Sequence, residues 1–323
     1  MRVIVIGLGS MGKRRIRLIK QFNPDIEIIG VDSREDRRDE TQALYRIKTA
    51  QTIGECSAGA VAAFVCTSPL SHHLIITECL DRGMNVFTEL NLVADDYDKN
   101  MKLASEKGLK LFLSSTILYR EEVEYINNRV SRCRGNVNYT YHVGQYLPDW
   151  HPWESYKDFF VGDKRTNGCR EFLAIELPWI QKVFGEISRV EVRKSKNSKL
   201  NIEYSDNYVL LIEHKTGAKG TLAVDIVSRK AVRNLEIFGE ELYLTWDGSG
   251  DGLYDYDIEA KEDRKVGLYD EVDHQEGYNK SIVENAYFKE VETFFSYIEE
   301  KTRPEYGFAE DKKTIEWLDI IEG

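Results

Sequence analysis

The first 32 residues constrain the fold of this chain more than any other stretch. An apolar run, Val3 to Ile6, leads directly into the sequence Gly7-Leu8-Gly9-Ser10-Met11-Gly12 and then into a basic segment with helical spacing. In such a strand, turn and helix, the first glycine takes a strained φ, the second lets the backbone approach a pyrophosphate, and the third lets the helix pack closely on the strand. The turn predicts a dinucleotide-binding domain, with the phosphates at the helix N-terminus.

A second apolar strand, Ile26 to Val31, supports this prediction because it ends in an acid. Asp32 follows Gly12 by 20 positions, the spacing expected for a carboxylate that binds the hydroxyls of the adenosine ribose. A carboxylate at this position repels a 2′-phosphate, so NAD is the expected cofactor. NADP stays open as the alternative, because Arg34 follows closely. The predicted cofactor-binding residues here are Gly7, Gly9, Ser10, Met11, Gly12, Asp32, Ser33 and Arg34.

Composition indicates a protein that handles a small molecule. The net charge of -11 and the isoelectric point near 5.2 argue against a nucleic-acid surface. The five cysteines have no paired spacing, and no apolar run approaches the length of a membrane span. No stretch has the ligand spacing of a metal site. We therefore expect a cytoplasmic protein without a bound metal, a signal peptide or a membrane segment.

The pattern of strands and helices changes near residue 118, and 323 residues exceed what one core usually organises. Strands and helices alternate up to that point, which predicts a doubly wound parallel α/β sheet in a Rossmann domain over residues 1–118. Two hairpins follow, 208–212 with 221–226 and 235–238 with 242–246, and the chain ends in two helices. Residues 119–323 are thus expected to form an α+β domain on a large, mainly antiparallel sheet.

Four segments carry a family resemblance: VIGLGSMG at the N-terminus, then TSPLSHH, GMNVFTELNLV and NGCREFLAIELPWIQKVFG, in that order. The whole chain resembles the glucose-fructose oxidoreductase / inositol dehydrogenase / MocA family. The resemblance implies an enzyme that oxidises or reduces a sugar, cyclitol or nucleotide-linked sugar with NAD(P), and a homodimer or homotetramer formed through the C-terminal sheet. It also places Thr67, Ser68, His73 and Glu89 on the cofactor side, whereas His72 is expected to be exposed.

The chain departs from the family at its catalytic positions. The usual Glu-Lys-Pro motif is here Glu89-Leu90-Asn91, so the family's lysine is missing. In the helix near residue 170, Glu171 stands at the family's aspartate position and Ile175 at its histidine position. Other groups must then exchange the substrate's proton. The candidates are His142, His151, Tyr146, Glu171 and Glu176, and histidine fits best because its pKa lies near neutrality.

Each candidate also has a structural interpretation. His142 can be an ordinary strand histidine. Pro178 is expected to distort the helix and so present Glu176 differently from the family, and the alternative is that Glu176 is an ordinary exposed helix glutamate. Trp150 and Trp153 either stack on a sugar ring or cap the core. An anionic substrate group is a further alternative, with the candidate ligands Lys164, Arg165 and Arg170. We expect replacement of the catalytic histidine to lower kcat more than Glu171→Gln does.

The sequence therefore predicts an NAD(P)-dependent oxidoreductase for a sugar-type substrate, of the kind used for surface polysaccharides among others. Two alternatives remain. One is a glycoside hydrolase or lyase that uses NAD transiently, and the other is a non-catalytic NAD(P)-binding sensor or partner protein. A net change in the absorbance of the reduced cofactor, measured with a candidate sugar, separates the first function from the other two.

Overall fold

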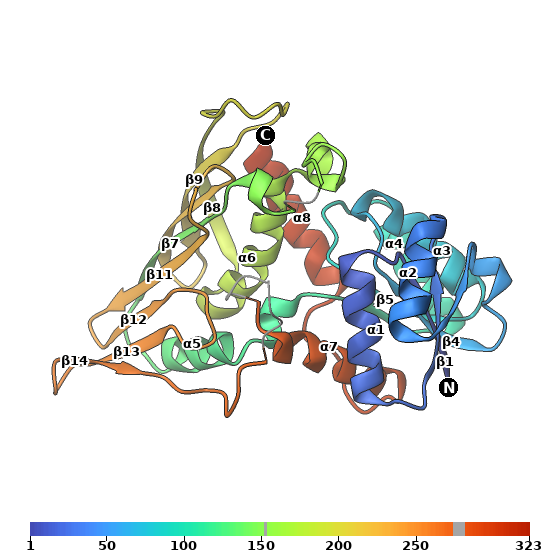
Figure 1. The fold of residues 1–323 in the computed structure, drawn as a ribbon. Coiled ribbons are helices and arrows are strands. Elements are labelled where there is room, and N and C mark those ends of the chain that lie inside the picture. The colour runs from blue at the N-terminus through green and yellow to red at the C-terminus, as the bar shows by residue number, and fades with distance from the viewer. Residues whose placement is uncertain (152–153, 274–281) are drawn as a thin grey trace. The chain divides into compact units, whose positions relative to one another are not determined.

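The computed structural model describes residues 1–151, 154–273 and 282–323, and its parts are shown in Figure 1. The chain packs as two compact units. The first comprises Met1–Ser115 and Tyr287–Ile315, and the second comprises Thr116–Ala286 and Glu316–Gly323. The segment Tyr287–Ile315, expected in the second domain, thus packs in the first unit. The expected boundary at residue 118 stays a prediction.

The first unit is built on a six-stranded sheet in the order β3-β2-β1-β4-β5-β6, and the neighbouring strands are all parallel. The order reverses between β1 and β4, as in a doubly wound sheet, so the predicted Rossmann fold is confirmed. The strands are β1 Arg2–Ile6, β2 Glu27–Val31, β3 Lys48–Ala50, β4 Ala60–Val65, β5 Asn85–Thr88 and β6 Leu111–Leu113.

Helices connect these strands, and residues on both faces of the central strands are buried. One side of the core is a set of packed rings, Phe64, Phe87, Phe112 and Phe294, with centroids 4.9–5.7 Å apart. The helices are α1 Ser10–Phe22, α2 Glu35–Tyr45, α3 His72–Asp81 and α4 Tyr97–Lys107, together with most of α7 Glu284–Ile298 and the first part of α8 Phe308–Glu322.

The second unit is built on an eight-stranded sheet in the order β14-β13-β12-β11-β7-β10-β9-β8. Every neighbouring pair is antiparallel except β7 with β10, which confirms the expected mainly antiparallel sheet. The strands are β7 Asn138–Gly144, β8 Ile187–Ser195, β9 Asn207–His214, β10 Lys219–Asp225, β11 Val232–Gly239, β12 Leu242–Trp246, β13 Leu253–Asp257 and β14 Glu262–Lys265.

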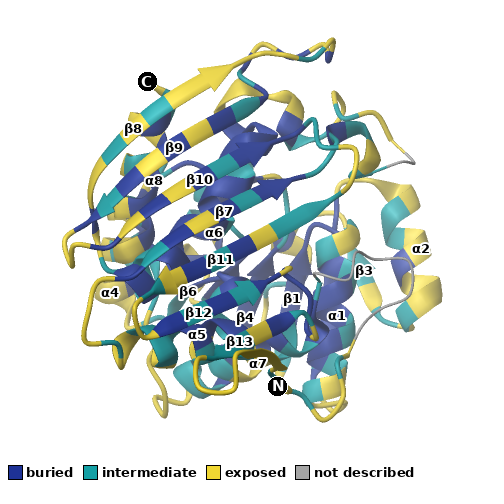
Figure 2. Cartoon of the chain, turned by 90° about the vertical axis from the view of Figure 1, so that its left-hand side faces the viewer, coloured by how far each residue is buried: buried dark blue, intermediate teal, exposed yellow. Residues whose placement is uncertain are grey.

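One face of this sheet packs against helices α5 (Glu121–Ser131) and α6 (Gly168–Phe184), and the other face is open (Figures 1 and 2). Buried and exposed residues alternate along β7, β9 and β10, as expected for a sheet covered on one side. Helix α6 continues through Pro178 without a break. Within the described residues, no helix combines the length and the apolar character that a bilayer span requires.

Candidate functional site

The glycine turn between β1 and α1 has the geometry that nucleotide binding requires. Gly7 has φ +89°, and a Cβ there would lie 2.7 Å from the carbonyl oxygen of Cys66. A Cβ on Gly12 would lie 1.9 Å from the carbonyl oxygen of Gly7, so only glycine lets the helix pack this closely. Around Gly9 the space is open, since the nearest atom is Arg37 Nη1 at 3.7 Å. The strained φ of Gly7 and the close packing at Gly12 agree with the expected turn, and the role of Gly9 beside a pyrophosphate stays a prediction.

Helix α1 begins directly after this turn, at Ser10 and Met11. Its N-cap is Gly9, which has no side chain to bond the first turn. No acidic residue lies in that turn. A helix N-terminus with these properties attracts an anion through its N–H groups and its dipole. This end of α1 therefore has the properties of an anion-binding helix N-terminus, and the placement of phosphates at Ser10 and Met11 stays a prediction.

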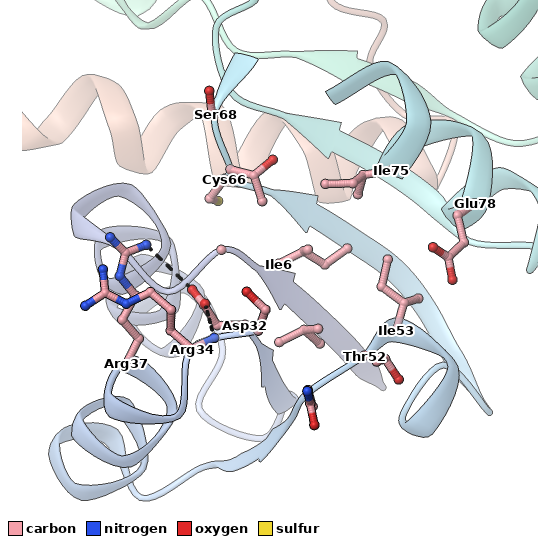
Figure 3. Close-up of a pocket in the computed structure, with 15 residues that line it drawn as sticks. Ile6, Asp32, Arg34, Arg37, Thr52, Ile53, Cys66, Ser68, Ile75 and Glu78 are labelled. Carbon is pink, nitrogen blue, oxygen red and sulfur yellow. Dashed lines mark hydrogen bonds and ion pairs between the residues drawn. The ribbon is translucent and has the colours of Figure 1, made fainter. Parts of the chain in front are cut away.

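Asp32 is held in place at the end of β2 by backbone donors. Its Oδ2 accepts a hydrogen bond of 2.8 Å from the N–H of Leu8, and its Oδ1 accepts one of 2.9 Å from the N–H of Arg34. The Nη1 atom of Arg37 lies 3.8 Å from Asp32 Oδ2 (Figure 3). Each carboxylate oxygen has two acceptor sites, so the oriented group still has capacity to accept bonds from ribose hydroxyls.

A pocket of about 480 Å³ opens beside this carboxylate (Figure 3). Its walls are Gly7 of the glycine turn, the end of β2 and the segment after β4, which contributes Cys66, Thr67 and Ser68. Ser33, Arg34 and Arg37 complete the side near Asp32. The open space at Gly9, the oriented acid and this volume fit the adenosine and phosphate part of a dinucleotide.

The two neighbouring histidines of α3 have different surroundings. His72, which was expected to be exposed, is 2% exposed and hydrogen-bonded on both ring nitrogens, so that prediction is wrong. It turns inward because Asn91 and the carbonyl of Thr67 offer buried partners. His73 is partly exposed, and its Nδ1 is buried without a hydrogen-bond partner among the described residues. It does not line the pocket beside Asp32.

Glu89, the first residue of the altered motif, is tied into a buried ion cluster. Arg15 donates from Nε to Glu89 Oε1 at 2.5 Å and from Nη2 to Glu89 Oε2 at 3.1 Å. The same guanidinium bonds Glu290 Oε2 at 2.8 Å, and Glu290 also accepts from Ser114. Burial raises the pKa of Glu290, and the positive charge of Arg15 opposes this rise. In the first unit, Glu89 is therefore held by Arg15.

In the second unit, His142 lies on the open face of the sheet. Its neighbours Tyr141 and Val143 are buried on the helix-covered face, and Tyr141 packs edge-on against Trp179 of α6 at 5.5 Å between centroids. Alternation along β7 therefore points His142 to the opposite face. There its Nε2 lies 2.7 Å from Asp225 Oδ2. This position separates His142 from every candidate on α6.

The loop after β7 holds the other two candidates at half-exposed positions. His151 pairs through Nδ1 with Glu154 at 2.8 Å and stacks on Phe159 at 4.4 Å between centroids. The guanidinium carbon of Arg229 lies over the ring of Tyr146, 3.7 Å from the centroid of that ring. Trp150 packs edge-on against Phe172 at 4.8 Å, which favours the core-capping interpretation. Trp153 lies outside the described residues.

Glu176 is fully buried on α6 and serves as an acceptor for three donors. They are the Tyr141 hydroxyl at 2.8 Å, Trp179 Nε1 at 2.6 Å and Arg233 Nε at 3.0 Å. The interpretation as an exposed glutamate is therefore wrong, because the strand residues Tyr141 and Arg233 supply partners that no local pattern reveals. A carboxylate with these three donors joins α6 to β7 and β11.

Glu171 differs from Glu176 in having no such partners. It lies in the first turn of α6, one turn before Ile175, and its Oε2 is buried without a hydrogen-bond partner among the described residues. Burial raises the pKa of Glu171 to about 7, and the positive charge of Arg233 opposes the rise. A carboxyl that changes charge near neutrality has the property required of a general acid or base.

The basic candidates near α6 differ in how far they are buried. Arg170 is buried, and it pairs with Asp319 at 2.7 Å and with Glu322. This pairing favours a structural role over binding an anion. Lys164 and Arg165 are exposed.

A second pocket, of about 520 Å³, lies in the second unit at the end of β7 and the start of β11. Gln145, Phe172, Arg233, Asn234 and Asp247 are among its lining residues. An aromatic ring beside amide and carboxylate groups is suited to a hydroxyl-rich ligand. Arg233 lines this pocket and donates to Glu176, and its positive charge opposes the rise in the pKa of Glu171.

Several residues of these sites were not predicted from the sequence. Arg37 follows Asp32 by five positions at the start of α2, and this proximity to the acid was a usable signal. Arg15 and Arg233 had no local signal, because their acidic partners are distant in the chain. In the described residues, no group of three or more histidine, cysteine, aspartate or glutamate side chains is arranged to hold a metal ion.

Comparison with known proteins locates the family match in the first unit. Residues 1–115 match the model of the oxidoreductase family with an NAD-binding Rossmann fold, GFO_IDH_MocA. No curated protein matches the sequence.

Solved structures share the fold over the whole length. UDP-N-acetylglucosamine 3-dehydrogenase GnnA from Acidithiobacillus ferrooxidans is 16% identical with a TM-score of 0.77, over 100% of this chain and 96% of that one. GenD2 from gentamicin A biosynthesis, in complex with NAD, is 19% identical with a TM-score of 0.75, over 99% and 92%. A putative myo-inositol dehydrogenase from Sinorhizobium meliloti is 15% identical with a TM-score of 0.74, over 99% and 95%.

At these identities the structural likeness establishes the fold, and the sequence match adds the family for residues 1–115. The resemblance predicted from the four sequence segments is thereby confirmed. Residues 1–115 thus match the NAD-binding Rossmann domain of the glucose-fructose oxidoreductase / inositol dehydrogenase / MocA oxidoreductase family.

Proposed function

We propose that this protein is a cytoplasmic NAD-dependent oxidoreductase acting on a CH–OH group of a sugar, cyclitol or sugar-nucleotide. The observation that carries the proposal is the pocket at the glycine turn, where Asp32 is oriented by two backbone N–H groups. Solved proteins of the same fold include a dehydrogenase of UDP-N-acetylglucosamine and a putative myo-inositol dehydrogenase. Five unpaired cysteine thiols support a reducing compartment.

We assign the residues of the cofactor site accordingly. Gly7, Gly9 and Gly12 shape the turn, Ser10 and Met11 receive the phosphates, and Asp32 binds the ribose. A second set completes the walls of the site: Ser33, Arg34, Arg37, Thr67 and Ser68. NAD, when bound, accepts or donates the hydride of the reaction. His73 and Glu89 support this site from outside the pocket.

Glu171 is the group that we assign to proton exchange. It occupies the family's aspartate position, and its unpaired buried oxygen and its pKa of about 7 suit the task that the missing lysine and histidine leave open. In the oxidising direction the substrate hydroxyl gives its proton to the Glu171 carboxylate. In the reducing direction the protonated carboxyl returns that proton to the substrate oxygen.

The remaining candidates have weaker support for this task. His142 lies on the open sheet face beside Asp225, and Glu176 is committed to three donors. His151 and Tyr146 lie in the loop after β7, where each contacts a neighbouring residue of its own unit.

A non-catalytic NAD-binding sensor is the second candidate function. The observation that favours it is the pair Leu90 and Ile175, neither of which can transfer a proton. The deciding experiment incubates the protein with NAD or NADH and a panel of UDP-sugars, free sugars and inositols. Net change in the absorbance of the reduced cofactor supports the oxidoreductase. Product formation without that change indicates transient use of NAD, and ligand binding without product indicates the sensor.

We also propose a homo-oligomer formed through the open face of the eight-stranded sheet. Its exposed positions include Val209, Leu211, Phe238 and Tyr254, which are 36–53% exposed. Apolar groups arranged on one sheet face are typical of an interface. Light scattering after size-exclusion chromatography is expected to give the mass of a dimer or tetramer for the native chain. The variant Leu211→Arg should shift it toward the monomer, and an unchanged native monomer would contradict the proposal.

A further inference from the structure

The altered motif Glu89-Leu90-Asn91 ends in a residue that makes a buried polar contact. Asn91 stands where the family has proline, and it is 2% exposed. Its side-chain amide lies 2.6 Å from Nδ1 of His72, which is also 2% exposed. The other ring nitrogen of His72 lies 2.9 Å from the carbonyl oxygen of Thr67. One imidazole therefore connects the segment after β5 to the segment after β4.

The chemistry of these partners determines the proton position on the ring. Burial lowers the pKa of His72, so the ring is neutral and carries one proton. A carbonyl oxygen can only accept a hydrogen bond, so the proton is on Nε2 and points to Thr67. Nδ1 then carries a lone pair and requires a donor.

Asn91 can supply that donor. Its Nδ2 is buried without a hydrogen bond of good geometry, although the Asn91 side chain also acts on the Tyr97 hydroxyl, whereas Oδ1 faces Nδ1. A half-turn of the amide, which leaves its shape unchanged, directs Nδ2–H to the ring and removes the unpaired donor. The hydroxyl of Thr88 also lies 3.2 Å from Nδ1, but its one proton has the carbonyl oxygen of Glu89 as an acceptor at the same distance. Asn91, His72 and Thr67 then form one directed chain of hydrogen bonds.

The end of this chain is a wall of the nucleotide pocket. Thr67 lines that pocket between Cys66 and Ser68. It also packs against the glycine turn, since a Cβ on Gly7 would lie 2.9 Å from Thr67 Cγ2. A shift of the Thr67 backbone would therefore move the wall of the pocket and disturb the contact with Gly7.

We propose that Asn91 and His72 are positioning residues for the dinucleotide, and that they act by fixing the Thr67 backbone at the pocket wall. Asn91 thus compensates in part for the proline that the family has at this position, by holding the segment after β5 with a side chain. The inference rests on NAD binding in the first unit, and it does not depend on turnover or on the identity of the substrate.

The first test is a double-mutant cycle on NADH affinity, measured by fluorescence titration of the full chain. We expect His72→Ala to weaken NADH binding about tenfold, because it leaves buried polar groups unpaired. Asn91→Ala should weaken it several-fold, and the double variant no more than His72→Ala alone, since both residues act through one chain. His72→Gln, whose amide offers a donor and an acceptor, should recover most of the affinity.

The matched control is Thr77→Val on the same helix. Thr77 bonds Asn100 and the carbonyl of His73 but does not line the pocket, so its loss is expected to lower the melting temperature without changing NADH affinity. If His72→Ala and Thr77→Val behave alike, with similar destabilisation and affinities within about twofold of the native chain, the proposal is overturned.

The second test needs no variant that risks unfolding. In ¹⁵N NMR spectra of the native protein, the ring of His72 should be the neutral tautomer protonated on Nε2, in the presence and the absence of NADH. A ring protonated on Nδ1, or one that gains a second proton near the ordinary histidine pKa of about 6.5, would overturn the proposed chain of hydrogen bonds.

Discussion

The nucleotide site of the first unit and the proton-transfer site of the second are built by different means. Backbone makes the first: a glycine at φ +89°, a helix that begins without a side-chain cap, and two N–H groups that orient Asp32. Burial makes the second: a carboxyl whose pKa is raised to about 7 by burial of the group. The first site can tolerate few changes at its glycines, whereas the second depends on the environment of one side chain.

The largest expected effect separates two glycines of the same turn. Gly12→Ala places a Cβ against the backbone of Gly7, so it should lower the melting temperature and reduce NADH affinity by about 100-fold or more. Gly9→Ala meets only open space in the protein, so it should weaken binding while the melting temperature stays unchanged. Calorimetry and NADH titration check both. Gly135→Ala, with no atom within 4 Å, is the control, and equal effects of the two turn variants would contradict the separate roles.

A smaller effect is expected for cofactor preference. Asp32 should make NADH bind more tightly than NADPH, because repulsion of a 2′-phosphate at 4 Å amounts to about 1 kcal/mol or more. Asp32→Ala should narrow this preference, since it leaves Arg37 and Arg34 at the pocket without the acid. Parallel titrations with the two cofactors measure it. Equal or tighter NADPH binding by the native chain would show that the arginines outweigh Asp32.

The smallest expected effect is on the free energy of unfolding. It tests the claim that burial raises the pKa of Glu171. The pKa of Glu171 is about 7 in the folded chain and ordinary, near 4.5, when unfolded. The folded state therefore holds a proton that the unfolded state releases, and stability falls as pH rises from about 4.5 through 7. Glu171→Gln should then be more stable than the native chain at about pH 8 and similar at about pH 4. Urea unfolding at both pH values checks this, with the exposed Glu191→Gln as a control.

The sequence predicted those parts of the molecule that depend on local spacing. The glycine turn, Asp32 and the hairpins are read within a few neighbouring residues, and the structure confirms the elements they form. His72 was misjudged because its partners lie in the segments after β4 and β5. The roles of Arg15 and Arg233 were not predicted for the same reason, since each meets a glutamate distant in the chain.

The candidates for proton transfer show the same limit in physical terms. Histidine was preferred because its ordinary pKa lies near neutrality, a property of the isolated side chain. Glu171 acquires a similar pKa only through burial, which no spacing in the sequence reveals. The strand position of His142 was predicted, but the face on which it lies follows only from the packing of Tyr141 against α6.

The most direct test of the central claim is the pH dependence of kcat for Glu171→Gln, measured with a substrate that the native protein turns over. General acids and bases contribute about 100- to 10,000-fold, so kcat should fall by at least about 100-fold while NADH affinity is unchanged. The limb of the native profile near pH 7 should disappear, and His142→Asn and His151→Asn should keep both the rate and the limb. Full activity of Glu171→Gln, or loss of the limb in a histidine variant, would contradict the assignment.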